Sequence, residues 1–308
     1  MFFIVIACLG ILLPLGTGIV ALGVFGRPSR RRGHPALLIH AVSETAIAGF
    51  SWVRTDRFAA LCSYLHEHGY KTRTVDEECG RAETDDTGHR ACVLTFDDGF
   101  ADFFDTALPI LDTYGIRATV FVISGFIGGR STWDVYGPRP HLDAEQIRRI
   151  AQAGHEVGSH TATHPDLLLL ASDDARREFI DSKKTLEDII AGPVRSISFP
   201  FGRWNRRLWE LARECGYRNA VVYGNHVPAG GRFVRVTGVY SFDTATDIID
   251  KVSPSRRFSN SAARGRIMPH FAKGSPLYRF RPEYRSFGRD TAARRLSTPP
   301  SENQNLVS

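Results

Sequence analysis

The stretch "VLTFDDGF", residues 93–100, decides how the rest of the chain is interpreted. An apolar run typical of a buried strand ends in two adjacent carboxylates, Asp97 and Asp98, followed by a glycine. In parallel α/β folds, functional side chains gather where the strands end. We therefore expect Asp97 and Asp98 to belong to a functional site rather than to an ordinary surface turn.

Outward from this stretch, short apolar runs alternate with amphipathic segments of helical period. The pattern predicts strands at 35–40, 91–96, 117–124, 155–160, 196–202, 219–222 and 232–240. It predicts helices at 55–70, 101–115, 143–154, 172–192, 205–216 and 244–252, and a loop at 78–90. Such alternation indicates an α/β domain with a parallel sheet, either open or closed into a barrel.

A second motif, "GHEVGSHTATHPDL" at 154–167, places His160 and His164 four residues apart after another predicted strand. Two imidazoles and one carboxylate are a typical ligand set for catalytic Zn²⁺, and they also suit other divalent metals. The second carboxylate could then act as a base. Taken alone, the Asp pair could cap a helix and the histidines could lie in a surface loop. Both motifs at strand ends of one α/β chain favour a metal site.

The pairing of "TFDDG" with "SHTATH" resembles the polysaccharide deacetylase family, the NodB-homology carbohydrate esterases of family four. The resemblance extends over about 35–245 and includes "LLIHAV", "ATVFVISGFIG", "SFPFG" and "FVRV". It implies a distorted (β/α)7 barrel and metal-dependent removal of N- or O-acetyl groups from sugars. The metal expected from this likeness is Zn²⁺, with Co²⁺, Ni²⁺ or Mn²⁺ as alternatives.

The resemblance also implies a role for each matching residue. Asp97 corresponds to the catalytic base, and Asp98, His160 and His164 to the metal ligands. The substrate or oxyanion positions are Phe201, Gly202 and Thr161, with the backbone N–H of Phe201 expected to help hold the oxyanion.

Two positions depart from the family pattern. Ser198 stands where an arginine normally orients the base, and Arg235 is the candidate to replace it, with a surface arginine as the alternative. The terminal Leu-x-His that supplies the general acid has no convincing match. His40 is the preferred acid, ahead of His226 and of "MPH" at 268–270.

The ends of the chain differ from its middle. Residues 1–26 contain no charged side chain, which predicts a transmembrane anchor followed by a basic linker at 27–34. A cleaved signal peptide is the alternative, but a basic leader is absent. The arginines of the linker predict a domain that faces the cytoplasm, whereas family habit favours the outside. We place the deacetylase-like domain at 35–252 and a basic, disordered tail at 253–308.

Charge and cysteine content argue against a nucleic-acid-binding protein and against a disulfide-stabilised one. Residues 33–250 hold 23 basic and 30 acidic side chains, and both ends of the chain are basic. This distribution favours contact with anionic lipid over nucleic acid. Five scattered cysteines form neither a disulfide framework nor a metal-ligand spacing.

We therefore expect a hydrolase that removes N-acetyl groups from an amino sugar, in a polysaccharide or in a lipid-linked glycan precursor. One alternative is a deformylase or another amide or imide hydrolase. A second is a membrane-tethered, non-catalytic carbohydrate-binding protein. The expected partners are the glycan and a membrane, and protein partners are left open.

Overall fold

The computed structural model describes residues 34–47, 49–81, 90–131, 138–223 and 232–253. The predicted anchor and nearly all of the linker and basic tail lie outside the described residues, as do His226 and "MPH". No helix within the described ranges is long and apolar enough to cross a membrane.

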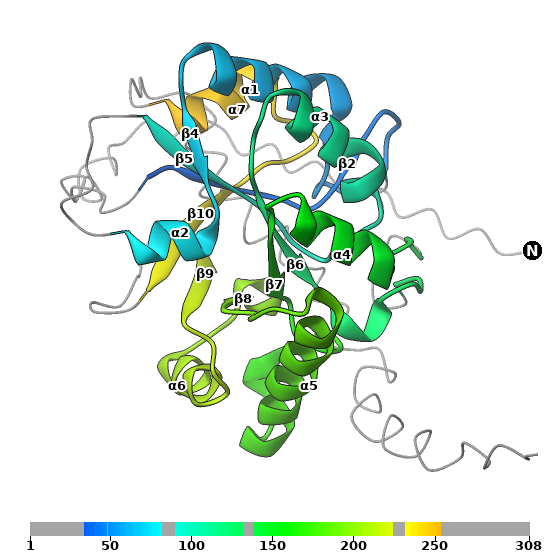
Figure 1. Ribbon diagram of the computed structural model, residues 1–308, viewed down its shortest axis with the longest axis vertical. Coiled ribbons are helices and arrows are strands. Elements are labelled where there is room, and N and C mark those ends of the chain that lie inside the picture. Colours follow the sequence, from blue (N-terminus) through cyan, green and yellow to red (C-terminus); the bar gives the residue numbers. More distant parts are fainter. Residues whose placement is uncertain (1–33, 48, 82–89, 132–137, 224–231, 254–308) are drawn as a thin grey trace, which may run out of the picture. The chain divides into compact units, whose positions relative to one another are not determined.

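Seven parallel strands close into a barrel (Figure 1). In chain order they are β1 (Ala36–Ile39), β5 (Ala91–Phe96), β6 (Thr119–Val122), β7 (Glu156–Ser159), β8 (Ser196–Ser198), β9 (Asn219–Tyr223) and β10 (Phe233–Gly238). Strands β5 to β10 pair successively, and β1 closes the ring between β10 and β5. The predicted α/β barrel of the (β/α)7 type is thus confirmed, and each predicted strand overlaps a barrel strand.

Three short strands were not predicted. Strand β4 (Lys71–Arg73) pairs with the first half of β5. Strand β6 pairs with the second half of β5, along the same edge of that strand. Strands β2 (Val42–Ser43) and β3 (Val53–Arg54) form a separate parallel pair. Each of these strands has only two or three residues, too few for a period-2 pattern to be visible.

Helices surround the barrel (Figure 1). They are α1 (Thr55–Glu67), α2 (Val75–Gly80), α3 (Leu108–Thr113), α4 (Ala144–Gln152), α5 (Ser172–Ile190), α6 (Arg206–Glu214) and α7 (Ala245–Val252). Helices α1 and α7 lie side by side although they come from opposite ends of the domain (Figure 1). Helix α2 replaces part of the predicted loop, and its capping box between Thr74 and Glu77 explains why it forms.

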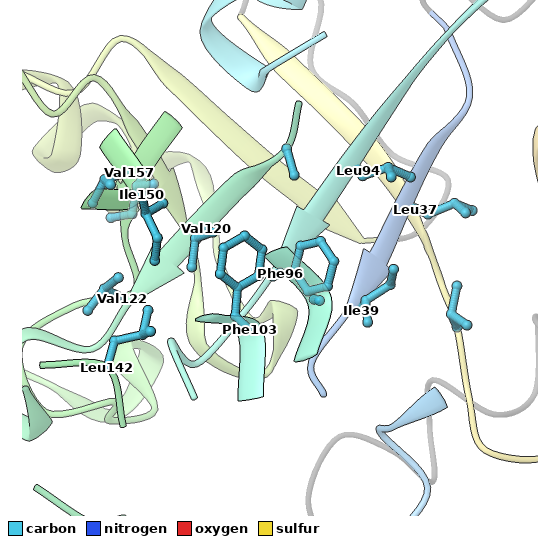
Figure 2. Close-up of a cluster of buried hydrophobic side chains, with 14 of the residues drawn as sticks. Leu37, Ile39, Leu94, Phe96, Phe103, Val120, Val122, Leu142, Ile150 and Val157 are labelled. Atoms are coloured by element: carbon cyan, nitrogen blue, oxygen red, sulfur yellow. The ribbon is translucent and has the colours of Figure 1, made fainter. Parts of the chain in front are cut away.

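Strict alternation along the strands separates two apolar layers. One fills the barrel and consists of Ala36, Leu38, Val75, Val93, Phe121, Val221, Val234 and Val236. The other lies between the strands and the helices, where Phe96 meets Phe103 with ring centroids 4.8 Å apart (Figure 2). Because successive side chains on a strand point to opposite faces, this register fixes which residues reach the barrel mouth.

Candidate active site

Asp97 and Asp98 follow β5 at the carboxyl end of the barrel, as expected. Val93 points into the barrel, so Asp97, four residues later, points inward as well. The Asp97 N–H donates to the Ile39 carbonyl at 3.0 Å, which fixes the end of β5 against β1. Both carboxylates are almost fully buried, with 5% and 4% of the residue exposed.

The turn after β5 requires unusual backbone geometry. Asp98 has a φ of 72° and Gly99 a φ of 66°, a region that side chains rarely adopt. A Cβ added to Gly99 would lie 3.1 Å from the Cα of Val122 on β6. The glycine of "TFDDG" is therefore needed both for the turn and for the close approach of the neighbouring strand.

The structure brings the three expected metal ligands together. Asp98 Oδ1 lies 3.5 Å from His160 Nε2 and 3.6 Å from His164 Nε2. One ligand atom from each residue lies within 4.8 Å of the others, and all three residues are buried. The predicted triad is thus a geometric cluster whose donor set, two imidazoles and a carboxylate, suits a divalent cation.

The hydrogen bond of His160 fixes how its ring is protonated. Nδ1 lies 2.8 Å from the Ser198 carbonyl, which can only accept, so Nδ1 carries the proton. Nε2 is then the nitrogen that faces Asp98, at 3.5 Å from Oδ1, and the one available to an ion. An outer hydrogen bond of this kind is typical of histidines that bind metals, and the residues present therefore fit such an ion.

Electrostatics separate the two carboxylates. Burial raises the pKa of Asp97, and the nearby charge of His160 only partly opposes this. Burial also acts to raise the pKa of Asp98, but the hydrogen bond from His160 and the interactions with the surrounding imidazoles outweigh it, so that pKa lies below its usual range. Burial lowers the pKa of His164 to about 3, so this ring is neutral near pH 7 and able to bind a metal.

A clamp that the sequence did not reveal holds the loop between the two histidines. Glu178 of α5 accepts hydrogen bonds from Ala162 N at 2.9 Å, Thr163 N at 2.8 Å and Thr163 Oγ1 at 2.6 Å. The loop has a φ of 69° at Thr161 and 61° at His164. Such backbone strain persists where the surroundings over-determine it, and Glu178 supplies that constraint.

Thr161 does not occupy the substrate position expected for it. The residue has no exposed surface, and its hydroxyl accepts the His164 N–H at 3.1 Å. Its contact is therefore internal to the loop, where it orients the second histidine rather than a sugar.

The structure does not bring Arg235 to Asp97. Val234 and Val236 of β10 belong to the cluster inside the barrel, so Arg235 between them faces outward. It also lies near the start of β10, away from the mouth where Asp97 is found. Ser198 itself replaces the missing arginine, because its hydroxyl donates to Asp97 Oδ2 at 2.9 Å.

His40 lies beside Asp97, as its register requires. Ile39 of β1 is level with Phe96 of β5, so the next residues of the two strands are neighbours. His40 is partly exposed, and its Nδ1 has no hydrogen-bond partner among the described residues. A partly exposed imidazole next to the candidate base is placed to exchange a proton, and the role of general acid stays a prediction.

Phe201 and Gly202 lie in a tight turn after β8. Phe201 has a φ of 59°, and its ring meets that of His164 edge-on at 4.6 Å. Gly202 has a φ of 59°, and an added Cβ would lie 3.1 Å from Tyr223. The Gly202 N–H already donates to the Phe199 carbonyl at 2.9 Å, so Phe201 is the better candidate for an oxyanion donor.

His141 is a third histidine near the metal triad that the sequence did not single out. Its Nδ1–H donates to the Asp98 carbonyl at 3.0 Å, and its ring stacks on Phe126 with centroids 5.3 Å apart. Burial lowers the pKa of His141 to about 4. It supports the strained turn at Asp98 from outside the cluster. No motif marks it, because its contact is with a backbone atom.

The described residues thus form a closed parallel barrel with an Asp-His-His cluster and a second aspartate at its mouth. The family model described as polysaccharide deacetylase matches residues 84–220, a little under half of the chain. The match includes both motifs and the turn after β8.

Curated relatives agree with this family. The chain is 34% identical over 189 residues to a putative polysaccharide deacetylase, YxkH, of Bacillus subtilis, covering 61% of this chain and 63% of the relative. It is 35% identical over 134 residues to the chitooligosaccharide deacetylase of Sinorhizobium fredii, covering 42% and 55%. The chain thus spans less than two thirds of the length of both relatives.

Solved structures agree on the fold. The Streptococcus pyogenes deacetylase PplD, solved with acetate, superposes with a TM-score of 0.63 at 24% identity, covering 72% of this chain and 99% of that one. A Bacillus cereus polysaccharide deacetylase superposes with a TM-score of 0.60 at 23% identity, covering 72% and 69%.

Proposed function

We propose that the chain is a metal-dependent hydrolase that removes N-acetyl groups from an amino sugar, in a polysaccharide or in a lipid-linked precursor. One observation carries the proposal. Two adjacent buried carboxylates have pKa values displaced in opposite directions, with Asp98 among the imidazoles and Asp97 beside them. Carboxylates separated in this way take different chemical roles.

Each residue then has a task. Asp98, His160 and His164 would hold a divalent cation, most simply Zn²⁺, which when bound polarises a carbonyl and lowers the pKa of water. Asp97 accepts the proton of the water that attacks the acetyl carbon. The C–N bond breaks, acetate leaves, and His40 gives a proton to the departing amine. The relatives named as deacetylases support the reaction class.

The test measures acetate release from N-acetylglucosamine oligomers by the whole chain with added Zn²⁺ or Co²⁺, beside Asp97→Asn. We expect release by the wild type and none above background by the variant, with equal bound metal by elemental analysis. Wild-type protein that holds metal but releases neither acetate nor formate from N-acetyl and N-formyl substrates would refute the proposal and favour a carbohydrate-binding role.

We also propose that residues 1–26 anchor the domain in a membrane. The support is the absence of charge over a length sufficient to cross a bilayer, roughly 20 residues in a helix. Alkaline extraction of membranes tests this, because an anchored chain stays in the pellet and a cleaved or peripheral one is released. Protease digestion of sealed cells then separates an outward domain from a cytoplasmic one.

A further inference from the structure

A cleft of about 760 Å³ lies at the amino-terminal end of the barrel, opposite the candidate active site. It is formed around β4, α2 and the loop that leads into β6. Four of its lining side chains are basic, namely Lys71, Arg73, Arg81 and Arg117, and Tyr70 and Tyr114 lie among them. Lys71 begins β4 and Arg117 precedes β6, so these charges lie where the strands start.

The positive charge of the cleft is only partly neutralised. Its one acidic lining residue, Glu77, accepts from Arg117 at 2.6 Å and from the Thr74 N–H at 2.9 Å. No carboxylate of the described residues lies within ion-pair distance of Lys71 or Arg73. The Nε of Arg73 is buried and has no hydrogen-bond partner there. Four cations against one carboxylate leave the lining of the cleft with a net positive charge, which favours an anion there.

Neighbouring strands extend this positive region. Basic residues stand immediately before or within two residues of the start of four further strands, at Arg90, Arg195, Arg218 and Arg232. Arg195 pairs with Asp76 at 3.2 Å, and Arg90 lies over the ring of Tyr70 at 5.9 Å. Asp76 also pairs with Arg232 at 3.8 Å, so part of this charge is neutralised.

We propose that this cleft binds a phosphate-bearing anion, with Arg73 and Lys71 as its main contacts. A guanidinium presents a planar fork of donors that matches phosphate oxygens, and a lysine adds a compact charge. The ligand is either the headgroup of an anionic lipid or a soluble phosphate ester.

The path of the chain is consistent with a lipid source. His34 donates its N–H to Glu78 Oε1 at 3.1 Å, and its Nδ1 lies 2.8 Å from Oε2 of the same residue on α2. The segment that leads from the apolar residues 1–26 therefore joins the domain at the end that carries the basic cleft. Residues 82–89, outside the described residues, contain three acids, so binding is measured on the whole chain.

The test compares wild type with Lys71→Gln/Arg73→Gln and with a control of equal charge change, Arg148→Gln/Arg206→Gln, on exposed faces of α4 and α6. Calorimetry with inorganic pyrophosphate is one arm. Sedimentation with phosphatidylglycerol vesicles, relative to phosphatidylcholine vesicles, is the other. Each basic residue removed near a lipid surface is expected to weaken binding about fivefold, so the pair loses about 25-fold.

A selective loss of pyrophosphate binding in the cleft variant supports the site with a soluble ligand. A selective loss of the preference for phosphatidylglycerol supports it with a lipid. Pyrophosphate that binds at the candidate metal centre would still bind to every variant. A preference for phosphatidylglycerol that comes from other basic segments of the chain would likewise remain in every variant. A cleft variant indistinguishable from the control in both arms overturns the proposal, as does wild type that binds neither probe. Lys71→Gln alone, at an exposed position, repeats the comparison if the double variant does not fold.

Discussion

Ser198 contacts Asp97 with a neutral hydroxyl where the family pattern has a cation. A hydrogen bond to an ionised group contributes about 1.5–3 kcal/mol, less than a bidentate guanidinium buried beside a carboxylate would provide. With no arginine to stabilise its charge, Asp97 keeps the raised pKa that burial gives it. The base of this site therefore depends on Ser198 and on its imidazole neighbours.

We predict that Ser198→Ala lowers deacetylation near neutral pH by about tenfold or more, since the bond it removes stabilises ionised Asp97. Loss of that donor raises the pKa of Asp97 further, so the acidic limb of kcat/KM moves to higher pH. Ser182→Ala is the control, because the hydroxyl of Ser182 bonds to Ser159 Oγ at 2.8 Å and not to Asp97. An unshifted acidic limb would show that Ser198 does not tune the base.

We predict that His40→Ala lowers turnover by about 100-fold or more, as expected when a general acid is removed, while bound metal is unchanged. His40 is absent from the cluster of ligand atoms, so elemental analysis should show wild-type metal content. The exposed His68 gives the matched control, His68→Ala. Loss of metal in His40→Ala would assign His40 to the metal site instead.

At the scale of elements, the two histidines depend on a helix that contributes no ligand. Helix α5 holds the His160–His164 loop through Glu178, and the same helix holds the segment before β8 through Glu187, which accepts the Val194 N–H at 2.9 Å. The two glutamates therefore provide a matched pair on one helix, one next to the metal triad and one remote from it.

We predict that Glu178→Ala weakens metal binding at least tenfold, because the freed N–H groups of Ala162 and Thr163 no longer hold the strained loop. Glu187→Ala should lower thermal stability without a change in metal affinity. Competition with a fluorescent Zn²⁺ chelator measures the affinity, and thermal melts of the metal-free proteins measure the stability. Equal metal affinities in the two variants would exclude the clamp.

Local patterns predicted a parallel α/β sheet, open or closed, and a metal site of two histidines and one aspartate, whereas the resemblance supplied the barrel and the choice of Asp98. Seven apolar runs predicted the seven strands. Because Asp97, Asp98, His160 and His164 follow the ends of two parallel strands, they lie at the same end of the barrel. The orientation of Arg235 required the exact phase of β10, which a single sequence does not give. Glu178 and His141 contact backbone atoms of other segments, which no local motif reveals. Thr161 was assigned to the substrate from the resemblance, but its hydroxyl accepts a hydrogen bond within its own loop.

At the scale of the whole molecule, buried histidines make stability depend on pH. His141 has a pKa lowered to about 4 by burial, against 6.5 in the unfolded chain. Its contribution is fully present above pH 6.5, because both states are then neutral. As the pH falls towards 4, the unfolded chain takes up a proton that the folded chain does not, so stability is lost.

We predict that this residue accounts for about 2 kcal/mol of stability lost between pH 7 and pH 5. His141→Asn keeps a donor for the Asp98 carbonyl. Between pH 7 and pH 5 its free energy of unfolding should fall by about 2 kcal/mol less than that of the wild type. Urea unfolding in EDTA gives the free energies, and the exposed His68→Asn is the control. Parallel pH dependences of His141→Asn and wild type would contradict the prediction.

The closing of the barrel by β1 bears on how the protein folds during synthesis. Strand β1 pairs with β10 at Phe233–Gly238, so the ring cannot be completed until nearly the whole domain has emerged from the ribosome. Asp98 follows β5 and the two histidines of the triad follow β7, while Ser198 ends β8. Strand β1 pairs with β5 directly, so His40 lies beside Asp97 without waiting for ring closure, which adds only the pairing of β1 with β10. The whole candidate metal triad is therefore synthesised before the strand that closes the ring.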